Sequence, residues 1–173
     1  MLSRLDRGVR KVVKALKNDG GWENTLLVFI TDNGEAIMRA GSNYPLRGTK
    51  STLFEGGTHG VGFVTGGFLS RSGEIISSLM HITDWYPTLF SAAGHRLTEE
   101  TETDGVDQWD VIRGKNTSKR TEVVYNLKMI LSPMGDIRLE SYKLMFGKNF
   151  KKDGWYNIDG ILNGKTRSTF LNY

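Results

Sequence analysis

Hydrophobic residues at the start of the chain recur at the spacing of an amphipathic helix. The apolar positions are Leu2, Leu5, Val9, Val12, Val13 and Leu16, and arginines and lysines occupy the other faces. This spacing predicts one surface helix with a solvated basic face. The sequence Asn-Asp-Gly-Gly at residues 18–21 supplies residues that end helices. Because the chain begins inside this pattern, we expect it to start within a domain.

A continuous apolar run follows at residues 25–31, with the sequence Thr-Leu-Leu-Val-Phe-Ile-Thr. It does not alternate with polar residues, and it is rich in branched and aromatic side chains. These features predict a central parallel strand that is buried on both faces. A helix followed by such a strand indicates an α/β fold. The run Val-Gly-Phe-Val at residues 61–64 predicts a second strand.

The rest of the chain predicts one more helix and then a small sheet. The helix covers residues 83–94, where Thr83 or Asp84 can cap its start and Gly94 can end it. Short strand-like runs then occupy residues 123–125, 137–139 and 142–146. A tight turn at residues 140–141 would make the last two strands antiparallel. We therefore expect an α/β region over residues 1–120 and a small antiparallel sheet region over residues 121–173.

Composition excludes several classes of protein and of site. The chain has 173 residues, of which 38% are apolar, and no apolar run is long enough to span a membrane. The 23 basic and 19 acidic residues give a net charge of +4, which is too small to indicate nucleic-acid binding. Cysteine is absent, so disulfides, thiolate metal ligands and a cysteine nucleophile are excluded. The first residues have no apolar stretch of the kind found in signal peptides.

Asp32 and Asn33 directly follow the predicted buried strand and are the first candidates for a site. Ligands of open α/β sheets bind at the carboxyl ends of the strands. A carboxylate and an amide oxygen are also ligands that Ca²⁺ and Mg²⁺ prefer. However, Asp-Asn-Gly is common in turns as well, and the tripeptide by itself favours the turn.

Five motifs in the order in which they occur resemble the sulfatase family. They are Ile-Thr-Asp-Asn-Gly at 30–34, Asn-Tyr-Pro-Leu-Arg-Gly-Thr-Lys at 43–50, Leu-Phe-Glu-Gly-Gly at 53–57 with Gly-Val-Gly-Phe-Val at 60–64, His-Ile-Thr-Asp-Trp-Tyr-Pro-Thr-Leu at 81–89 and Asp-Gly-Val-Asp-Gln-Trp at 104–109. Their order and spacing look like the arylsulfatase B (N-acetylgalactosamine-4-sulfatase) branch. The resemblance covers about residues 1 to 130, and it implies part of an alkaline-phosphatase-like α/β domain.

The resemblance also implies roles for three residues. Asp32 and Asn33 match a pair of ligands of the divalent cation in that family, which is usually Ca²⁺. Lys50 matches the lysine that contacts the substrate sulfate, a role that suits a compact positive charge. Arg47 is expected to have a structural role. Two positions depart from the family: Glu35 replaces a glycine or alanine, and His59 replaces the arginine of Glu-Gly-Gly-x-Arg.

The absence of cysteine is the largest departure from the family. Sulfatases use a formylglycine nucleophile made from the cysteine of a Cys-x-Pro-x-Arg motif. The sequence Asn-Tyr-Pro-Leu-Arg at residues 43–47 is the nearest match, but an asparagine amide cannot become the aldehyde hydrate. We therefore expect the chain to be the C-terminal portion of a sulfatase, with the formylglycine in a missing N-terminal half, and to be inactive alone.

The resemblance implies a hydrolase acting on sulfated carbohydrates or aryl sulfates, with N-acetylgalactosamine 4-sulfate as the expected type. Relatives in the family are lysosomal or secreted glycoproteins, and Asn-Thr-Ser at residues 116–118 fits a glycosylation site. Two other functions remain open at this point. One is a non-catalytic module of the same fold that binds anions or sugars, and the other is a phosphate-ester hydrolase of the same superfamily. The residues do not indicate an oligomeric state.

Overall fold

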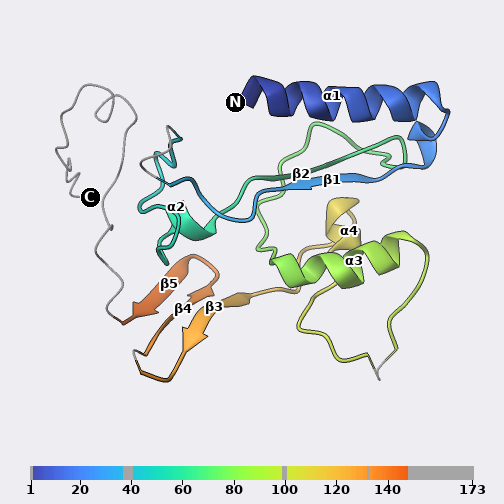
Figure 1. Ribbon diagram of the computed structural model, residues 1–173. Helices are drawn as coiled ribbons and strands as arrows, with labels where there is room; N and C mark the ends of the chain where they lie inside the picture. Colours follow the sequence, from blue (N-terminus) through green and yellow to red (C-terminus); the bar gives the residue numbers. More distant parts are fainter. Residues whose placement is uncertain (1, 37–40, 99–100, 132, 148–173) are drawn as a thin grey trace.

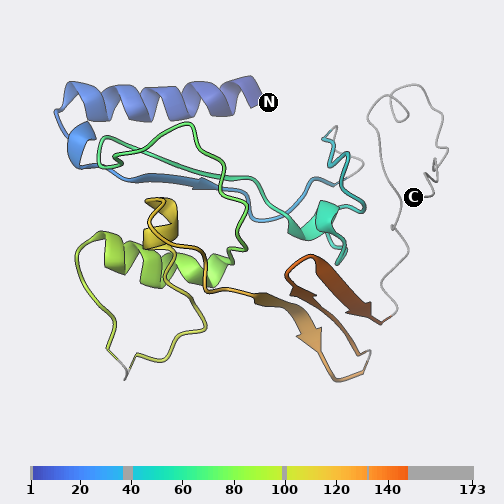
Figure 2. The same cartoon turned by 180° about the vertical axis from the view of Figure 1, so that it is seen from behind.

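The structure, a computed structural model, describes residues 2–36, 41–98, 101–131 and 133–147. The helical elements are α1 (Leu2–Asn18), η1 (Trp22–Asn24), α2 (Glu55–Thr58), η3 (Ile82–Asp84), α3 (Trp85–Ala92) and α4 (Trp109–Ile112). The strands are β1 (Leu27–Ile30), β2 (Gly62–Thr65), β3 (Glu122–Lys128), β4 (Met134–Leu139) and β5 (Tyr142–Phe146). Figures 1 and 2 show the β1–β2 pair between α1 and the helices α3 and α4, with β3–β5 beside α2. This arrangement confirms the predicted α/β fold class with an antiparallel sheet near the C-terminus.

The first helix forms where the hydrophobic spacing predicts it. It ends at residues 19–21, where the backbone N–H of Gly21 donates to Leu16 at 3.0 Å and Gly20 adopts a positive φ of 75°. No residue of α1 is buried, and Leu2 is 82% exposed. The described part of the chain therefore covers only a portion of the apolar face of this helix.

The structure forms the strand predicted at residues 25–31, but the prediction that it is parallel to its neighbour is wrong. β1 pairs with β2 in antiparallel register, from Leu27 opposite Thr65 to Ile30 opposite Gly62. The rings of Phe29 and Phe63 stack at 5.0 Å on this pair. Three residues of β1 are half-buried and the fourth is exposed. A continuous apolar run indicates that a strand is buried, but it does not determine whether the neighbouring strand is parallel or antiparallel.

The helical segment predicted near residue 83 is capped by His81, and not by Thr83 or Asp84 as the sequence indicated. His81 precedes η3 and forms a capping box with Asp84: the Thr83 N–H donates to His81 Nδ1 at 3.5 Å, and the His81 N–H donates to Asp84 Oδ2 at 2.8 Å. Asp84 makes no side-chain cap to α3 itself. Burial of the imidazole, assisted by the nearby Arg120 guanidinium, lowers the pKa of His81. Gly94 ends the helix with a positive φ of 84°, as predicted.

A buried ion pair joins this helix to the start of the C-terminal sheet. The Asp84 side chain is fully buried, and Arg120 Nε donates to its two oxygens at 2.8 and 3.0 Å. The Val106 N–H donates to the same carboxylate at 2.8 Å, and Arg120 also donates to the Asp104 carbonyl at 2.8 Å. One carboxylate therefore holds three segments together.

The C-terminal sheet confirms the three predicted strand segments. Its order is β3-β4-β5, and both pairs are antiparallel. Glu140, in the turn between β4 and β5, has a φ of 50°. Residues 148–173 of the expected 121–173 region lie outside the described residues. Among the described helices, none combines the length and the apolar character that a membrane span needs.

Candidate functional site

The three residues that the sequence singled out line one cavity. Asp32, Asn33 and Lys50 contribute to a cavity of about 470 Å³ together with residues 31 and 34–36. Asp32 and Asn33 lie just beyond the carboxyl end of β1, which ends at Ile30. Lys50 reaches the same cavity from the loop between β1 and α2. The structure therefore brings an acid, an amide and an ammonium group together from two segments.

Backbone contacts between glycines hold these two segments against α2. The Gly34 N–H donates to the Gly57 carbonyl at 3.0 Å, and the Gly56 N–H donates to the Arg47 carbonyl at 2.6 Å. A Cβ at Gly34 would lie 1.8 Å from the Gly56 oxygen, and a Cβ at Gly56 would lie 2.4 Å from the Gly48 oxygen. Side chains do not fit at these positions, so the glycines of three motifs form a backbone interlock, the contacts among Gly34, Arg47, Gly48, Gly56 and Gly57.

Replacing Gly34 with alanine should therefore destabilise the chain by about 1–3 kcal/mol or more, the range for overpacking a tight site. Gly8→Ala is the matched control, because no atom lies within 4 Å of a Cβ built there. It sits in the interior of α1, where alanine is favoured over glycine by roughly 0.5–1 kcal/mol. Denaturant unfolding of both variants measures the difference. Equal stability of Gly34→Ala and the unmodified chain would contradict the interlock.

The backbone of Glu35 is the centre of a second set of contacts. Asn43 Oδ1 accepts from the Glu35 N–H at 2.7 Å, and Asn43 Nδ2 donates to the Glu35 carbonyl at 2.9 Å and to the Gly48 carbonyl at 3.3 Å. Thr49 Oγ1 and the Lys50 N–H donate to the same Glu35 carbonyl at 2.7 and 3.1 Å. The sequence did not indicate this role of Asn43 and Thr49. An asparagine in a loop beside glycines is the only signal for it, and that signal is weak.

The two departures from the family pattern lie in different places. Glu35 lines the cavity, and its own carboxylate accepts the Ala36 N–H at 3.1 Å. His59 is 59% exposed, and its Nδ1 lies 3.5 Å from Glu55 Oε2. Arg47 places its guanidinium 4.3 Å from the centre of the Phe54 ring, in keeping with the structural role expected of it. Of the two departures, only Glu35 bears on the chemistry of the cavity.

The donor set of the cavity fits part of a site for a hard cation. The side chains of Asp32 and Asn33 make no hydrogen bond or ion pair with another described residue, so their oxygens are available as ligands. Ca²⁺ takes six to eight oxygen ligands. The described residues contain no group of three or more acidic, histidine or cysteine residues that could hold a metal. Asp32 and Asn33 therefore suit a shared site, in which other ligands complete the coordination.

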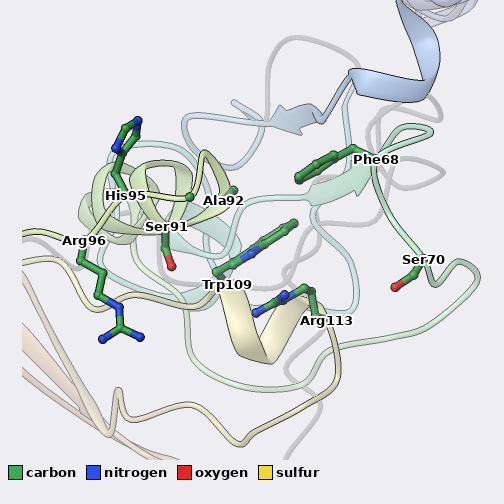
Figure 3. Close-up of a pocket in the computed structure, with 9 residues that line it drawn as sticks. Phe68, Ser70, Ser91, Ala92, His95, Arg96, Trp109 and Arg113 are labelled. Atoms are coloured by element: carbon green, nitrogen blue, oxygen red, sulfur yellow. The ribbon is translucent and has the colours of Figure 1, made fainter.

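A second cavity of about 480 Å³ lies near α3 and α4 (Figure 3). Trp109 lines it, and its ring is stacked on Phe68 with the ring centres 5.8 Å apart. The Arg113 guanidinium lies 5.2 Å from the same ring and pairs with Asp110 at 2.5 Å. Because the indole and this cation already have partners, we base the functional site on the first cavity, which shares no residue with the second.

Comparisons with known proteins match most of the chain to a single family. The family model described as sulfatase matches residues 1–95. Arylsulfatase J from Mus musculus is 42% identical over 130 residues, which cover 75% of this chain and 22% of that protein. N-acetylgalactosamine-6-sulfatase from Mus musculus is 33% identical over 107 residues, covering 60% of this chain and 21% of that protein.

Solved structures resemble the chain over nearly all of its length. The crystal structure of Ps i-CgsB in complex with k-i-k-neocarrahexaose has a TM-score of 0.77 at 26% identity and covers 94% of this chain and 36% of that one. The PsFucS1 sulfatase from Pseudoalteromonas sp. has a TM-score of 0.69 at 25% identity, with 96% and 37% covered. The chain spans about a fifth of the length of the curated relatives, and the family match contains Asp32, Asn33 and Lys50. The chain belongs to the sulfatase family.

Proposed function

We propose that this chain supplies two metal ligands and one sulfate contact to an enzyme that hydrolyses sulfate esters. The observation that carries the proposal is the convergence of Asp32, Asn33 and Lys50 on one cavity. A pair of oxygens that can hold a cation and an ammonium group meet there. A bound cation and the ammonium group could both attract a sulfate. A doubly charged metal and a lysine are suited to hold a sulfate and to stabilise negative charge that develops on its oxygens.

Each of the three residues has a separate task in this proposal. The Asp32 carboxylate and the Asn33 amide oxygen hold Ca²⁺, which when bound polarises a sulfate oxygen. The Lys50 ammonium binds a second sulfate oxygen as a point charge. The backbone interlock fixes the distance between the segment of Asp32 and the segment of Lys50, since it joins both to α2. This preorganisation removes the need to reorganise the site when charge develops.

The attacking group must come from outside these 173 residues. The chain has no cysteine from which a formylglycine could form, and the Asn43 side chain is used in hydrogen bonds to Glu35 and Gly48. Metal and lysine can polarise a sulfate ester but cannot replace the nucleophile. We therefore propose that the isolated chain does not turn over sulfate esters, and that a formylglycine segment completes the site.

We also propose the substrate class and the cellular location from the relatives. Sulfated carbohydrates of the N-acetylgalactosamine 4-sulfate type fit the resemblance noted in the sequence, and a relative named N-acetylgalactosamine-6-sulfatase supports a sulfated amino sugar. Aryl sulfates serve as general probes. A lysosomal or secreted location agrees with the glycosylation sequence at residues 116–118, where Asn116 is exposed.

The metal assignment can be tested by calorimetric titration with CaCl₂ of a chimera in which this chain replaces the matching part of mouse arylsulfatase J, so that other ligands can complete the shared site. Asp32→Ala should weaken Ca²⁺ affinity by at least about tenfold, because even the loss of an outer-shell partner of a metal costs 10–100-fold. Asp19→Ala is the matched control, since Asp19 is an exposed carboxylate in the turn after α1. Unchanged affinity in Asp32→Ala, or an equal loss in Asp19→Ala, would refute the assignment.

A further inference from the structure

A cluster of charged side chains joins α2 to the C-terminal sheet. Arg138 Nη1 lies 2.6 Å from Glu55 Oε2, and Lys143 Nζ lies 3.0 Å from Glu55 Oε1. Lys143 also donates to Thr58 Oγ1 at 2.8 Å and lies 3.0 Å from Asp136 Oδ2. The partners of Glu55 are 83 and 88 residues away in the sequence. We call the contacts of Glu55 with Arg138 and Lys143 the ionic clamp.

The side chains of the clamp are partly shielded from water, so their ion pairs can contribute to the stability of the contact. The side chains of Lys143, Glu55 and Arg138 are 13%, 27% and 28% exposed, whereas pairs on an open surface are largely screened. Asp136 is fully buried, and burial raises the pKa of its carboxyl. The Lys143 ammonium also lies 4.4 Å from the centre of the Tyr125 ring. Two carboxylates and two cations balance within the cluster, so removing one cation leaves negative charge without a counterion.

The clamp gives Glu55 two cationic partners in a chain that lacks the arginine of the family pattern. The family pattern Glu-Gly-Gly-x-Arg would put an arginine four residues after Glu55, but this chain has His59 there. The imidazole is more than half exposed, and its 3.5 Å approach to Glu55 is longer than either contact of the clamp. An imidazole is charged only when it is protonated, whereas arginine is always charged. Arg138 and Lys143 supply permanent charge from another part of the fold.

A short path connects the clamp to the candidate site. Glu55 is the first residue of α2, and the next two residues are Gly56 and Gly57. Gly56 donates to the Arg47 carbonyl in the segment of Lys50, and Gly57 accepts from Gly34 in the segment of Asp32. Because side chains are excluded from these contacts, a shift of α2 cannot be absorbed by a rotamer change. A displacement of Glu55 would therefore move both segments of the site.

We propose that Glu55, Arg138 and Lys143 are positioning residues: through the ionic clamp, the C-terminal sheet holds α2 and thereby sets the geometry of Asp32, Asn33 and Lys50. This inference rests on the proposed function for the identity of the site, but the clamp itself can be tested without it. The 121–173 region then acts as a support for the site rather than as a separate appendage.

The first experiment measures hydrogen exchange of backbone amides in the full chain. Arg138→Ala should speed exchange at Gly34 and Gly56 by about fivefold, the scale expected for losing a partly shielded ion pair that restrains a local opening. Arg138→Lys should restore most of the protection, because it keeps the charge. Lys128→Ala is the matched control, since Lys128 is an exposed cation on β3 of the same sheet.

The outcomes separate positioning from general stability. Faster exchange at Gly34 and Gly56, without a matching increase at β1 or α3, supports the clamp. Unchanged exchange at both glycines, or an equal increase along the whole chain, overturns it. If Arg138→Ala does not fold, Glu55→Gln replaces it in the experiment, because it removes the charge and keeps the size of the side chain. The clamp then requires the same pattern of exchange in Glu55→Gln.

The second experiment repeats the CaCl₂ titration on Arg138→Ala and Arg138→Lys. A severalfold loss of affinity in the alanine variant that the lysine variant recovers supports transmission to the metal ligands. Equal affinities in both variants and the unmodified chimera refute that transmission. If the unmodified chimera, in which other ligands can complete the site, binds no Ca²⁺, the proposed function fails, while the exchange experiment on the chain still decides whether the clamp holds the glycine contacts.

Discussion

Lys50→Ala should reduce turnover of a sulfate ester by about 10²–10³-fold, the usual scale for removing one preorganised group that stabilises developing charge. Its affinity for Ca²⁺ should stay nearly unchanged, because an ammonium group is not a metal ligand. Asp32→Ala differs, since it should lower metal affinity and turnover together. The contrast between these two variants separates the sulfate contact from the metal site, although both residues line the same cavity.

The measurement needs a formylglycine in the same enzyme. A chimera can supply it, in which the matched 130 residues of mouse arylsulfatase J are exchanged for those of this chain, since the two are 42% identical there. Steady-state kinetics with a chromogenic aryl sulfate then compare Lys50→Ala with Lys14→Ala, a change of an exposed lysine in α1. Near-full turnover of Lys50→Ala would remove the sulfate role. Binding of the aryl sulfate without any turnover in the unmodified chimera would favour a non-catalytic module.

The grouping of the three candidate residues around one cavity could be expected from the sequence because its signals are local, whereas their roles stay a prediction. Asp32 and Asn33 follow a strand directly, and Lys50 lies in the next loop within a recognisable motif. Chain connectivity alone keeps such residues within reach of one cavity. The glycines at 34, 56 and 57 were visible in the sequence, but their mutual contact was not, because it depends on how the loop folds back on α2.

Other features could not be predicted because they depend on partners distant in the sequence. The apolar run at residues 25–31 indicated a buried strand, and three of the four residues of β1 are half-buried. Its antiparallel pairing depends on β2, which lies more than 30 residues later in the chain. Glu55 finds its cations more than 80 residues later, and nothing near Arg138 or Lys143 in the sequence marks them as its partners. The boundary at residue 120 stays a prediction, and the ionic clamp shows that contacts cross it.

Asp84 shows how a local interpretation can identify a residue and miss its main partner. The sequence indicated a helix cap, and the carboxylate does accept the His81 N–H. Its strongest interaction is with Arg120, which lies 36 residues further along. Two N–H groups from the backbone and one guanidinium share this fully buried carboxylate. Burying a charge in this way is tolerable only while every one of these partners is present.

Arg120→Ala should therefore destabilise the chain by about 3–5 kcal/mol, the range for removing one member of a buried ion pair. The cause is the charge left on Asp84, so the double variant with Asp84→Asn should recover part of the loss. Asparagine keeps an oxygen that accepts a backbone N–H but carries no charge. Asp84→Asn alone should be destabilising, because the Arg120 guanidinium, 11% exposed, then lacks its counterion.

Denaturant unfolding of the four proteins in this cycle measures the coupling, with Arg4→Ala in exposed α1 as the control. The decisive result is a change of sign: Asp84→Asn lowers stability when Arg120 is present and raises it when Arg120 is alanine. If Asp84→Asn is equally destabilising in both backgrounds, the carboxylate acts only as an acceptor for the backbone. The ion pair would then not be what joins the helix at residue 85 to the C-terminal sheet.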